Sequence, residues 1–99
     1  MSAKHFFHDY FGTVTEKLND IDSESLEQAA TMVRRAQGTG NKVILAGNGG
    51  SAAMASHVAV DLTKAAGIRA VNFNEADLLT CLANDYGYEN WVAKALEFY

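Results

Sequence analysis

Apolar residues along the chain follow two different patterns, and their alternation predicts an α/β protein. Apolar spacings of three and four, or a long stretch without Gly or Pro, predict helices over 7–21, 26–36, 52–66, 74–83 and 89–99. Short uninterrupted apolar runs, typical of buried strands in a parallel sheet, cover 43–46 and 68–73. Two leading helices followed by strand, helix and strand predict a right-handed parallel βαβ unit after a helical segment.

The glycine-rich segment between the first strand and its helix is the main candidate for function. Gly47-Asn48-Gly49-Gly50-Ser51 follows the apolar run directly. Glycines allow backbone N–H groups to approach a ligand closely, and a helix start adds unpaired donors and partial positive charge. Ser51 stands where an N-cap residue is expected, so its hydroxyl would cap the helix or bind a ligand oxygen. The segment is therefore a candidate site for an anionic group.

The spacing of this turn excludes one ligand class and leaves others open. A P-loop needs Lys-Ser or Lys-Thr after its last glycine, whereas two alanines follow Ser51. A dinucleotide fingerprint is loosely met by Gly47, Gly49 and Ala52, with Glu75 after the second strand as the ribose-binding acid. A small polyol phosphate held by the turn is another reading. A further alternative is that backbone geometry alone requires these glycines and that the turn binds no ligand.

A histidine and a carboxylate follow on the helix after the turn. His57 and Asp61 are four residues apart, so they lie on one helix face. Such a pair suits a metal ion or acid–base catalysis. An ordinary His–Asp hydrogen bond on a surface helix is the alternative.

Length and composition restrict the classes of protein further. The 99 residues allow one domain, and a two-stranded sheet would leave both edges open, so we expect the first part of a longer domain. A net charge of −4 gives no basic field for nucleic acid. The single cysteine, Cys81, fits a reducing compartment. Without a signal peptide or membrane-spanning run, we expect a cytoplasmic protein that binds neither nucleic acid nor membrane.

The turn together with its downstream residues resembles a known family. Gly47–Ser51, His57, Asp61-Leu62 and Asn84-Asp85-Tyr86-Gly87 are similar to motifs of the sugar isomerase (SIS) family, with the closest likeness to phosphoheptose isomerases. The resemblance implies a flavodoxin-like, three-layer α/β fold with a parallel sheet flanked by helices. Residues 1–99 would be the N-terminal portion of one SIS domain. Within it, 1–40 would be helical and mediate a homotetramer, and 41–99 would be the βαβ-type phosphosugar-binding part.

The resemblance also implies a role for each matching residue. Phosphoheptose isomerases interconvert sedoheptulose 7-phosphate and D-glycero-D-manno-heptose 7-phosphate for surface-polysaccharide synthesis. By position, the residues expected to bind substrate are Asn48, Gly49, Gly50, Ser51, Asn84 and Asp85. His57 is expected to bind zinc, and Asp61 to be both a zinc ligand and the catalytic base.

Two departures from the family pattern qualify these expectations. Asp61 stands where these enzymes carry a glutamate, and Ala65 stands where an arginine is expected. The family's phosphate loop and C-terminal catalytic helix would follow Tyr99, so we expect the 99-residue chain alone to be inactive. A non-catalytic SIS module that binds a sugar phosphate or a protein partner is the alternative function, and a nucleotide-binding fragment is a weaker one.

The first predicted helix carries a heavy aromatic face. Phe7, Tyr10, Phe11, Val14 and Leu18 recur at spacings of three and four. Such a face needs a covering surface, either within its own domain or on another subunit. The family resemblance favours the subunit interface.

Overall fold

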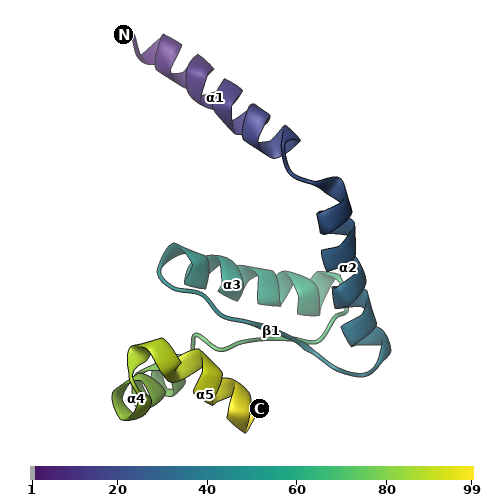
Figure 1. Cartoon of the computed structure of the whole chain (residues 1–99), viewed down its shortest axis with the longest axis vertical. Helices are drawn as coiled ribbons and strands as arrows, with labels where there is room; N and C mark the ends of the chain where they lie inside the picture. Colours follow the sequence, from purple (N-terminus) through teal and green to yellow (C-terminus); the bar gives the residue numbers. More distant parts are fainter. Residues whose placement is uncertain (1) are drawn as a thin grey trace. The chain divides into compact units, whose positions relative to one another are not determined.

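Two leading helices, a short parallel βαβ unit and two further helices follow one another along the chain (Figure 1). The computed structural model describes residues 2–99, which divide into two units, 1–32 and 33–99. The elements are α1 (Ala3–Asn19), α2 (Ser23–Gly38), β1 (Val43–Leu45), α3 (Gly50–Val60), the π-helical η1 (Asp61–Ala65), β2 (Ala70–Asn72), α4 (Ala76–Tyr86), the 3₁₀ turn η2 (Tyr88–Asn90) and α5 (Trp91–Phe98).

The first unit consists of α1 and the beginning of α2. The hydroxyl of Ser2 caps α1 by accepting a hydrogen bond from the His5 N–H, at 3.3 Å. The aromatic face predicted from the sequence is present, and all side chains from 2 to 32 are exposed. Rings four residues apart stack along the helix, Phe6 on Tyr10 and Phe7 on Phe11. What covers this face stays a prediction.

The second unit contains the parallel sheet. β1 and β2 pair in the register Val43↔Ala70, Ile44↔Val71 and Leu45↔Asn72. The Val43 N–H donates to the Arg69 carbonyl at 2.8 Å, and the Phe73 N–H to the Leu45 carbonyl at 2.9 Å. The predicted parallel strand–helix–strand unit is thus confirmed. Its strands are shorter than the apolar runs because ladder pairing, rather than hydrophobicity, defines a strand.

Helices cover both faces of the sheet in this unit, which gives three layers. In Figure 1, α3 runs along one side of β1, and α4 with α5 occupy the other. On the α4–α5 side, Phe73, Leu82, Trp91 and Ala95 form a buried cluster against which Ile44 packs. On the α3 side, Ala55 and Ala59 are buried. Small side chains there let α3 approach the strands closely.

Two predicted elements differ from the observed ones. The helix predicted over 52–66 begins at Gly50 and becomes π-helical from Asp61, where the Ala66 N–H donates to the Asp61 carbonyl. The segment 84–88, predicted as a loop, is helical as far as Tyr86. That helix ends only at Gly87, whose φ of 91° favours glycine and whose N–H bonds the Ala83 carbonyl. Asn84 and Asp85, residue types common in turns, therefore do not end α4.

None of the helices within residues 2–99 combines the length and the apolar character that a membrane crossing requires.

Candidate functional site

The turn after β1 depends on the small size of Gly47. A Cβ placed on Gly47 would lie 2.4 Å from the backbone carbon and oxygen of Ser51. The Asn74 side chain, just beyond β2, holds Gly47 from the other side. Its Oδ1 accepts from the Gly47 N–H at 2.8 Å, and its Nδ2 donates to the Gly47 carbonyl at 2.7 Å. The turn is therefore fastened to the carboxyl end of the neighbouring strand.

Ser51 closes the turn rather than capping the helix, which corrects the N-cap prediction. The N-cap residue is Gly49, whose φ of 60° and ψ of −122° few side chains tolerate. The Ser51 Oγ accepts from the Asn48 N–H at 2.7 Å and donates to the Asn48 carbonyl at 2.9 Å. The prediction failed because α3 begins two residues earlier than expected, so Ser51 lies inside its first turn.

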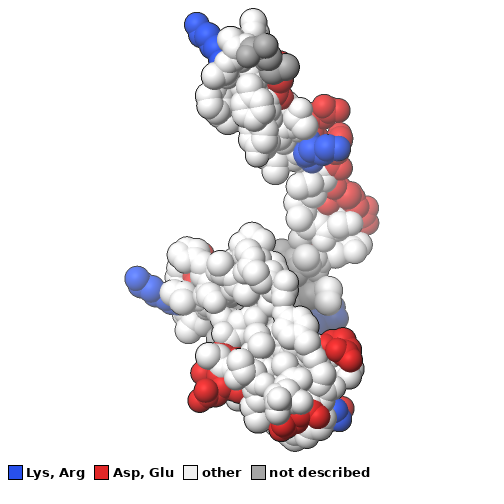
Figure 2. Space-filling model, turned by 90° about the vertical axis from the view of Figure 1, so that its left-hand side faces the viewer, with Lys and Arg blue, Asp and Glu red and all other residues white. Residues whose placement is uncertain are grey.

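Two backbone donors remain at this turn. Within residues 2–99, the N–H groups of Gly49 and Gly50 have no hydrogen-bond partner. They lie at the N-terminal end of α3, where the helix dipole adds partial positive charge. Figure 2, viewed from the side on which the turn lies in Figure 1, shows basic side chains only near the margins of the second unit. The turn thus offers backbone donors to an oxygen ligand, without a cluster of cationic side chains.

A hollow of about 390 Å³ adjoins the turn. It is lined by Ala46, Gly47, Asn48, Tyr88, Glu89, Trp91 and Val92. The Tyr88 hydroxyl donates a hydrogen bond to the Asn48 Oδ1 across this hollow. The segment after α4 is therefore tied directly to the turn after β1.

The predicted His57–Asp61 pair forms on the surface of α3 and η1. The His57 Nε2 lies 3.5 Å from the Asp61 Oδ2, and the two side chains are 80% and 59% exposed. Two ligands of a tetrahedral zinc ion lie about 3.3 Å apart, so these atoms fit two positions of such a site. However, no group of three or more His, Cys, Asp or Glu side chains suited to a metal occurs within residues 2–99. His57 and Asp61 are therefore a pair of potential ligands rather than a group of three.

Asn84 and Asp85 lie in the last turn of α4. The Asn84 Nδ2 donates to the Asp85 Oδ1 at 3.2 Å, and the Cys81 Sγ donates to the Asp85 Oδ2 at 3.6 Å. The Asp85 negative charge raises the pKa of the Cys81 thiol, with smaller contributions from desolvation and the hydrogen bond. The neighbouring carboxylate therefore disfavours the thiolate form of Cys81.

Glu75 has a structural role at the start of α4. Its carboxylate accepts from the Leu78 N–H at 2.9 Å, and backbone donors at Leu78 and Asp77 lower the pKa of Glu75. Glu75, which would bind a ribose if the turn were a dinucleotide fingerprint, therefore caps α4 instead.

The predicted site residues form three local pairs. Asn48 bonds Ser51, His57 faces Asp61, and Asn84 bonds Asp85. Within the described chain, no hydrogen bond or ion pair links one pair to another.

Two residues that organise the site were missed by the sequence reasoning: Asn74 and Tyr88. Asn74 could have been predicted from the sequence, because it follows the second predicted strand. The carboxyl ends of adjacent parallel strands meet at one edge of a sheet, so Asn74 would be expected near the turn after the first strand. For Tyr88 there was no such signal, because its partner Asn48 is 40 residues away.

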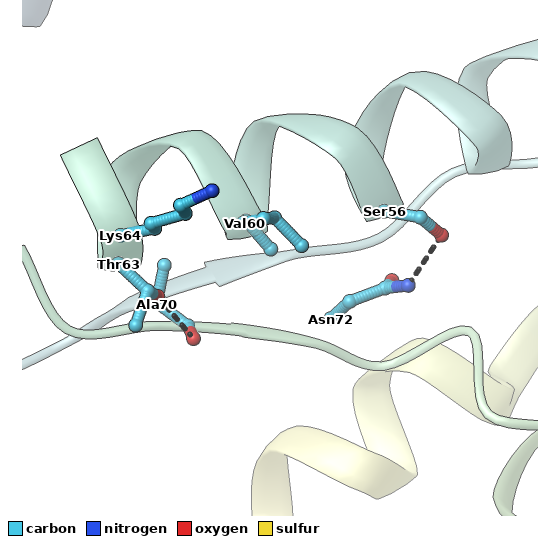
Figure 3. A pocket seen from close by; sticks show the side chains of 7 residues that line it. Ser56, Val60, Thr63, Lys64, Ala70 and Asn72 are labelled. Atoms are coloured by element: carbon cyan, nitrogen blue, oxygen red, sulfur yellow. Dashed lines mark hydrogen bonds between the residues drawn. The ribbon is translucent and has the colours of Figure 1, made fainter.

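A second hollow, of about 400 Å³, lies between α3, η1 and β2, away from the turn. Figure 3 shows the Lys64 side chain toward one end and the bonded pair Ser56–Asn72 toward the other. The Ser56 hydroxyl also donates to the Ala52 carbonyl, and the Thr63 hydroxyl to the Ala70 carbonyl. Its hydroxyl groups are thus engaged within the protein.

Comparison with known families and structures agrees with this architecture. Residues 6–98 match the SIS domain. The chain therefore belongs to the SIS domain family, and the fold is the SIS-type α/β fold.

Named relatives and a solved structure place the chain more closely within the family. Phosphoheptose isomerase 2 from Campylobacter jejuni is 38% identical over 78 residues, which are 73% of this chain and 39% of the relative. Phosphoheptose isomerase from Aneurinibacillus thermoaerophilus is 37% identical over 78 residues, with the same two shares, 73% and 39%. The structure of phosphoheptose isomerase GmhA from Neisseria gonorrhoeae superposes with a TM-score of 0.80 at 28% identity, covering 97% of this chain and 54% of that chain. The chain thus spans about two fifths of these curated relatives and about half of the solved one.

Proposed function

We propose that this chain is part of a phosphosugar isomerase that interconverts sedoheptulose 7-phosphate and D-glycero-D-manno-heptose 7-phosphate for surface-polysaccharide heptose synthesis. The relatives named phosphoheptose isomerase support this proposal. One structural observation carries it: α3 begins at the donor-bearing turn and continues into a segment where His57 and Asp61 face each other. The pair lies about two to three helical turns from Ser51.

The proposed roles follow from the chemistry of an aldose–ketose isomerisation. The reaction moves a proton between C1 and C2 through an enediol, so it needs a base next to those carbons. Asp61 is the proposed base, and its largely exposed carboxylate is accessible to a substrate. Asn48, Gly49, Gly50 and Ser51 are proposed to bind the sugar phosphate, together with Asn84 and Asp85.

Zinc is a further part of this proposal. His57 and Asp61 would supply two of its ligands, and the remaining ligands would come from outside residues 2–99. A bound zinc ion would polarise the substrate carbonyl. The roles of the turn and of the Asp61 base do not depend on it.

We also propose a cytoplasmic homotetramer assembled through residues 1–40. Support comes from the exposed aromatic face of α1, which includes Phe7, Tyr10 and Phe11. Aromatic side chains bury large areas at interfaces and are rarely left exposed in such a row.

A non-catalytic SIS module that binds a sugar phosphate or a protein partner is the second candidate. Asp61 is one methylene shorter than the family glutamate, and a misplacement of about 1 Å can cost about a hundredfold in rate. Ala65 likewise offers no positive charge where the family has an arginine. Both departures count against the isomerase reaction.

Turnover of sedoheptulose 7-phosphate by the native protein that carries this sequence separates the two candidates. We expect turnover in the wild type, loss of at least about 10²-fold in Asp61→Asn, and nearly unchanged binding of the sugar phosphate in that variant. The matched variant Asp61→Glu restores the family residue and should keep or raise turnover. Binding without turnover in both wild type and Asp61→Glu would favour the non-catalytic module. Full activity in Asp61→Asn would remove Asp61 from the mechanism.

A further inference from the structure

Asn48 is fixed at both its backbone and its side chain. Ser51 bonds its N–H and its carbonyl, and the Tyr88 hydroxyl bonds its Oδ1. Its neighbour Gly47 is held by Asn74. An exposed asparagine in a glycine-rich turn would otherwise sample several rotamers.

The Tyr88 bond also sets which side of the Asn48 amide faces outward. A carboxamide carries an acceptor oxygen at one corner and a two-hydrogen donor at the other, and rotation of about 180° exchanges them. A phenol hydroxyl that donates to Oδ1 holds the oxygen corner toward Tyr88. The Nδ2 of Asn48 then has no partner within residues 2–99 and is available as a donor.

Three unpaired groups at the turn are donors. They are the Asn48 Nδ2 and the backbone N–H groups of Gly49 and Gly50. A ligand group that only accepts hydrogen bonds, such as a phosphate or carbonyl oxygen, satisfies all three. A ligand hydroxyl can meet these three donors only with the lone pairs of its oxygen.

We propose that Tyr88 is a positioning residue that orients the Asn48 amide as a donor and so makes this turn selective for acceptor oxygens, phosphate or carbonyl. The inference rests on the proposed function, in which Asn48 contacts the sugar phosphate. Tyr88 acts through Asn48 rather than on the substrate.

The segment that carries Tyr88 is itself well anchored. The Asn90 N–H donates to the Gly87 carbonyl at 3.1 Å, and the Asn90 Nδ2 to the Tyr86 carbonyl at 2.9 Å. The next residue, Trp91, is buried in the core. The hydroxyl is therefore presented from a defined turn, which a positioning role requires.

The first test observes the Asn48 side-chain NH₂ resonances of the ¹⁵N-labelled native protein that carries this sequence. Tyr88→Phe removes only the hydroxyl, and we expect it to shift these resonances. Tyr86→Phe is the matched control, because it removes a phenol hydroxyl two residues away that has no hydrogen bond within residues 2–99. Unchanged Asn48 resonances in Tyr88→Phe would overturn the inference whether or not the chain binds a ligand.

The second test is a double-mutant cycle on binding to the native protein, with inorganic phosphate and sedoheptulose 7-phosphate as separate probes. Tyr88→Phe should weaken binding about five- to tenfold, the worth of one neutral hydrogen bond. In an Asn48→Ala background the same change should have almost no effect, because Tyr88 would have lost the group it orients. Circular dichroism melts of each variant check that the fold is retained.

The two probes distinguish a phosphate oxygen from a carbonyl oxygen at Asn48. They also distinguish failure of the positioning role from failure of the proposed function. A loss for both probes indicates a phosphate oxygen at Asn48, and a loss for the sugar phosphate alone indicates a carbonyl oxygen. Equal losses from Tyr88→Phe with and without Asn48 would overturn the positioning role. Equal affinities of the wild type and Tyr88→Phe for the sugar phosphate would also overturn the positioning role. A wild-type protein that binds neither probe would instead refute the proposed function.

Discussion

The carboxamide of Asn74 pairs with both backbone groups of Gly47, which lies 27 residues earlier in the chain, at 2.8 and 2.7 Å. The Asn74 side chain thus makes the two hydrogen bonds with Gly47 that the backbone of a neighbouring strand would otherwise make. The Asn74 N–H in turn donates to the Asn72 Oδ1, and the Asn72 Nδ2 donates to the Ser56 hydroxyl. The turn, β2 and α3 are thus joined in a continuous polar network.

Removing this amide should destabilise the second unit. Asn74→Ala leaves the partly buried N–H and carbonyl of Gly47 unpaired, which we expect to cost about 1–3 kcal/mol of unfolding free energy. Asn41→Ala is the control, because Asn41 is exposed and its amide bonds only Thr39 nearby, so its cost should stay within about 0.5 kcal/mol. Urea denaturation followed by circular dichroism measures both. Equal stabilities of Asn74→Ala and Asn41→Ala would contradict the bridging role.

Gly47 and Gly50 should respond oppositely to the same substitution. Gly47→Ala forces a methyl group against the Ser51 backbone, with an expected cost of about 1–3 kcal/mol or more. A Cβ on Gly50 meets nothing within 4 Å, and this residue is the first of α3. Gly50→Ala should therefore leave stability unchanged or raise it by up to about 1 kcal/mol. Thermal melts of the two variants check this, and a tolerated Gly47→Ala would mean that the turn can rearrange.

The Glu75 cap should make α4 sensitive to acid. Backbone N–H donors, that of Leu78 above all, hold the folded-state pKa of Glu75 below its ordinary value of 4.5. The carboxylate therefore stabilises the folded state fully above that value, and this contribution is lost as the pH falls through the lowered pKa. Wild type should be more stable than Glu75→Gln at pH 6, and the gap should narrow below pH 4.5. Denaturation at a series of pH values tests this, and a gap independent of pH would exclude the charged cap.

Asp85 should control the reactivity of Cys81. Its negative charge is the main cause of the raised pKa of the Cys81 thiol, and Asp77 makes the smallest contribution. Only the thiolate is alkylated, so Asp85→Asn should speed the reaction with iodoacetamide at pH 8. Asp77→Asn should have a smaller effect in the same direction. In denaturant all variants should react alike, and a folded-state rate unchanged by Asp85→Asn would show that the two side chains do not interact.

Local patterns in the sequence were sufficient for the order of the elements. The apolar run at 43–46, the glycines after it and the uninterrupted segment beyond them predicted β1, its turn and α3 in the right order, although α3 begins two residues earlier than expected. These features act between neighbouring residues, because strand formation, positive φ at glycine and helix formation depend on the local chain. The His57–Asp61 pair was predictable for the same reason, since four residues bring two side chains to one helix face. The family motifs likewise predicted the SIS-type fold.

Only the tertiary structure decided how the turn is held and which of its groups remain free. Ser51 closes the turn instead of capping α3, Asn74 clamps Gly47, and Tyr88 orients Asn48. The last two contacts join residues 27 and 40 positions apart, and spacing along a chain carries no information about such distances. They arise because parallel pairing brings the carboxyl ends of β1 and β2 together, and because the buried Trp91 fixes the segment after α4 beside them.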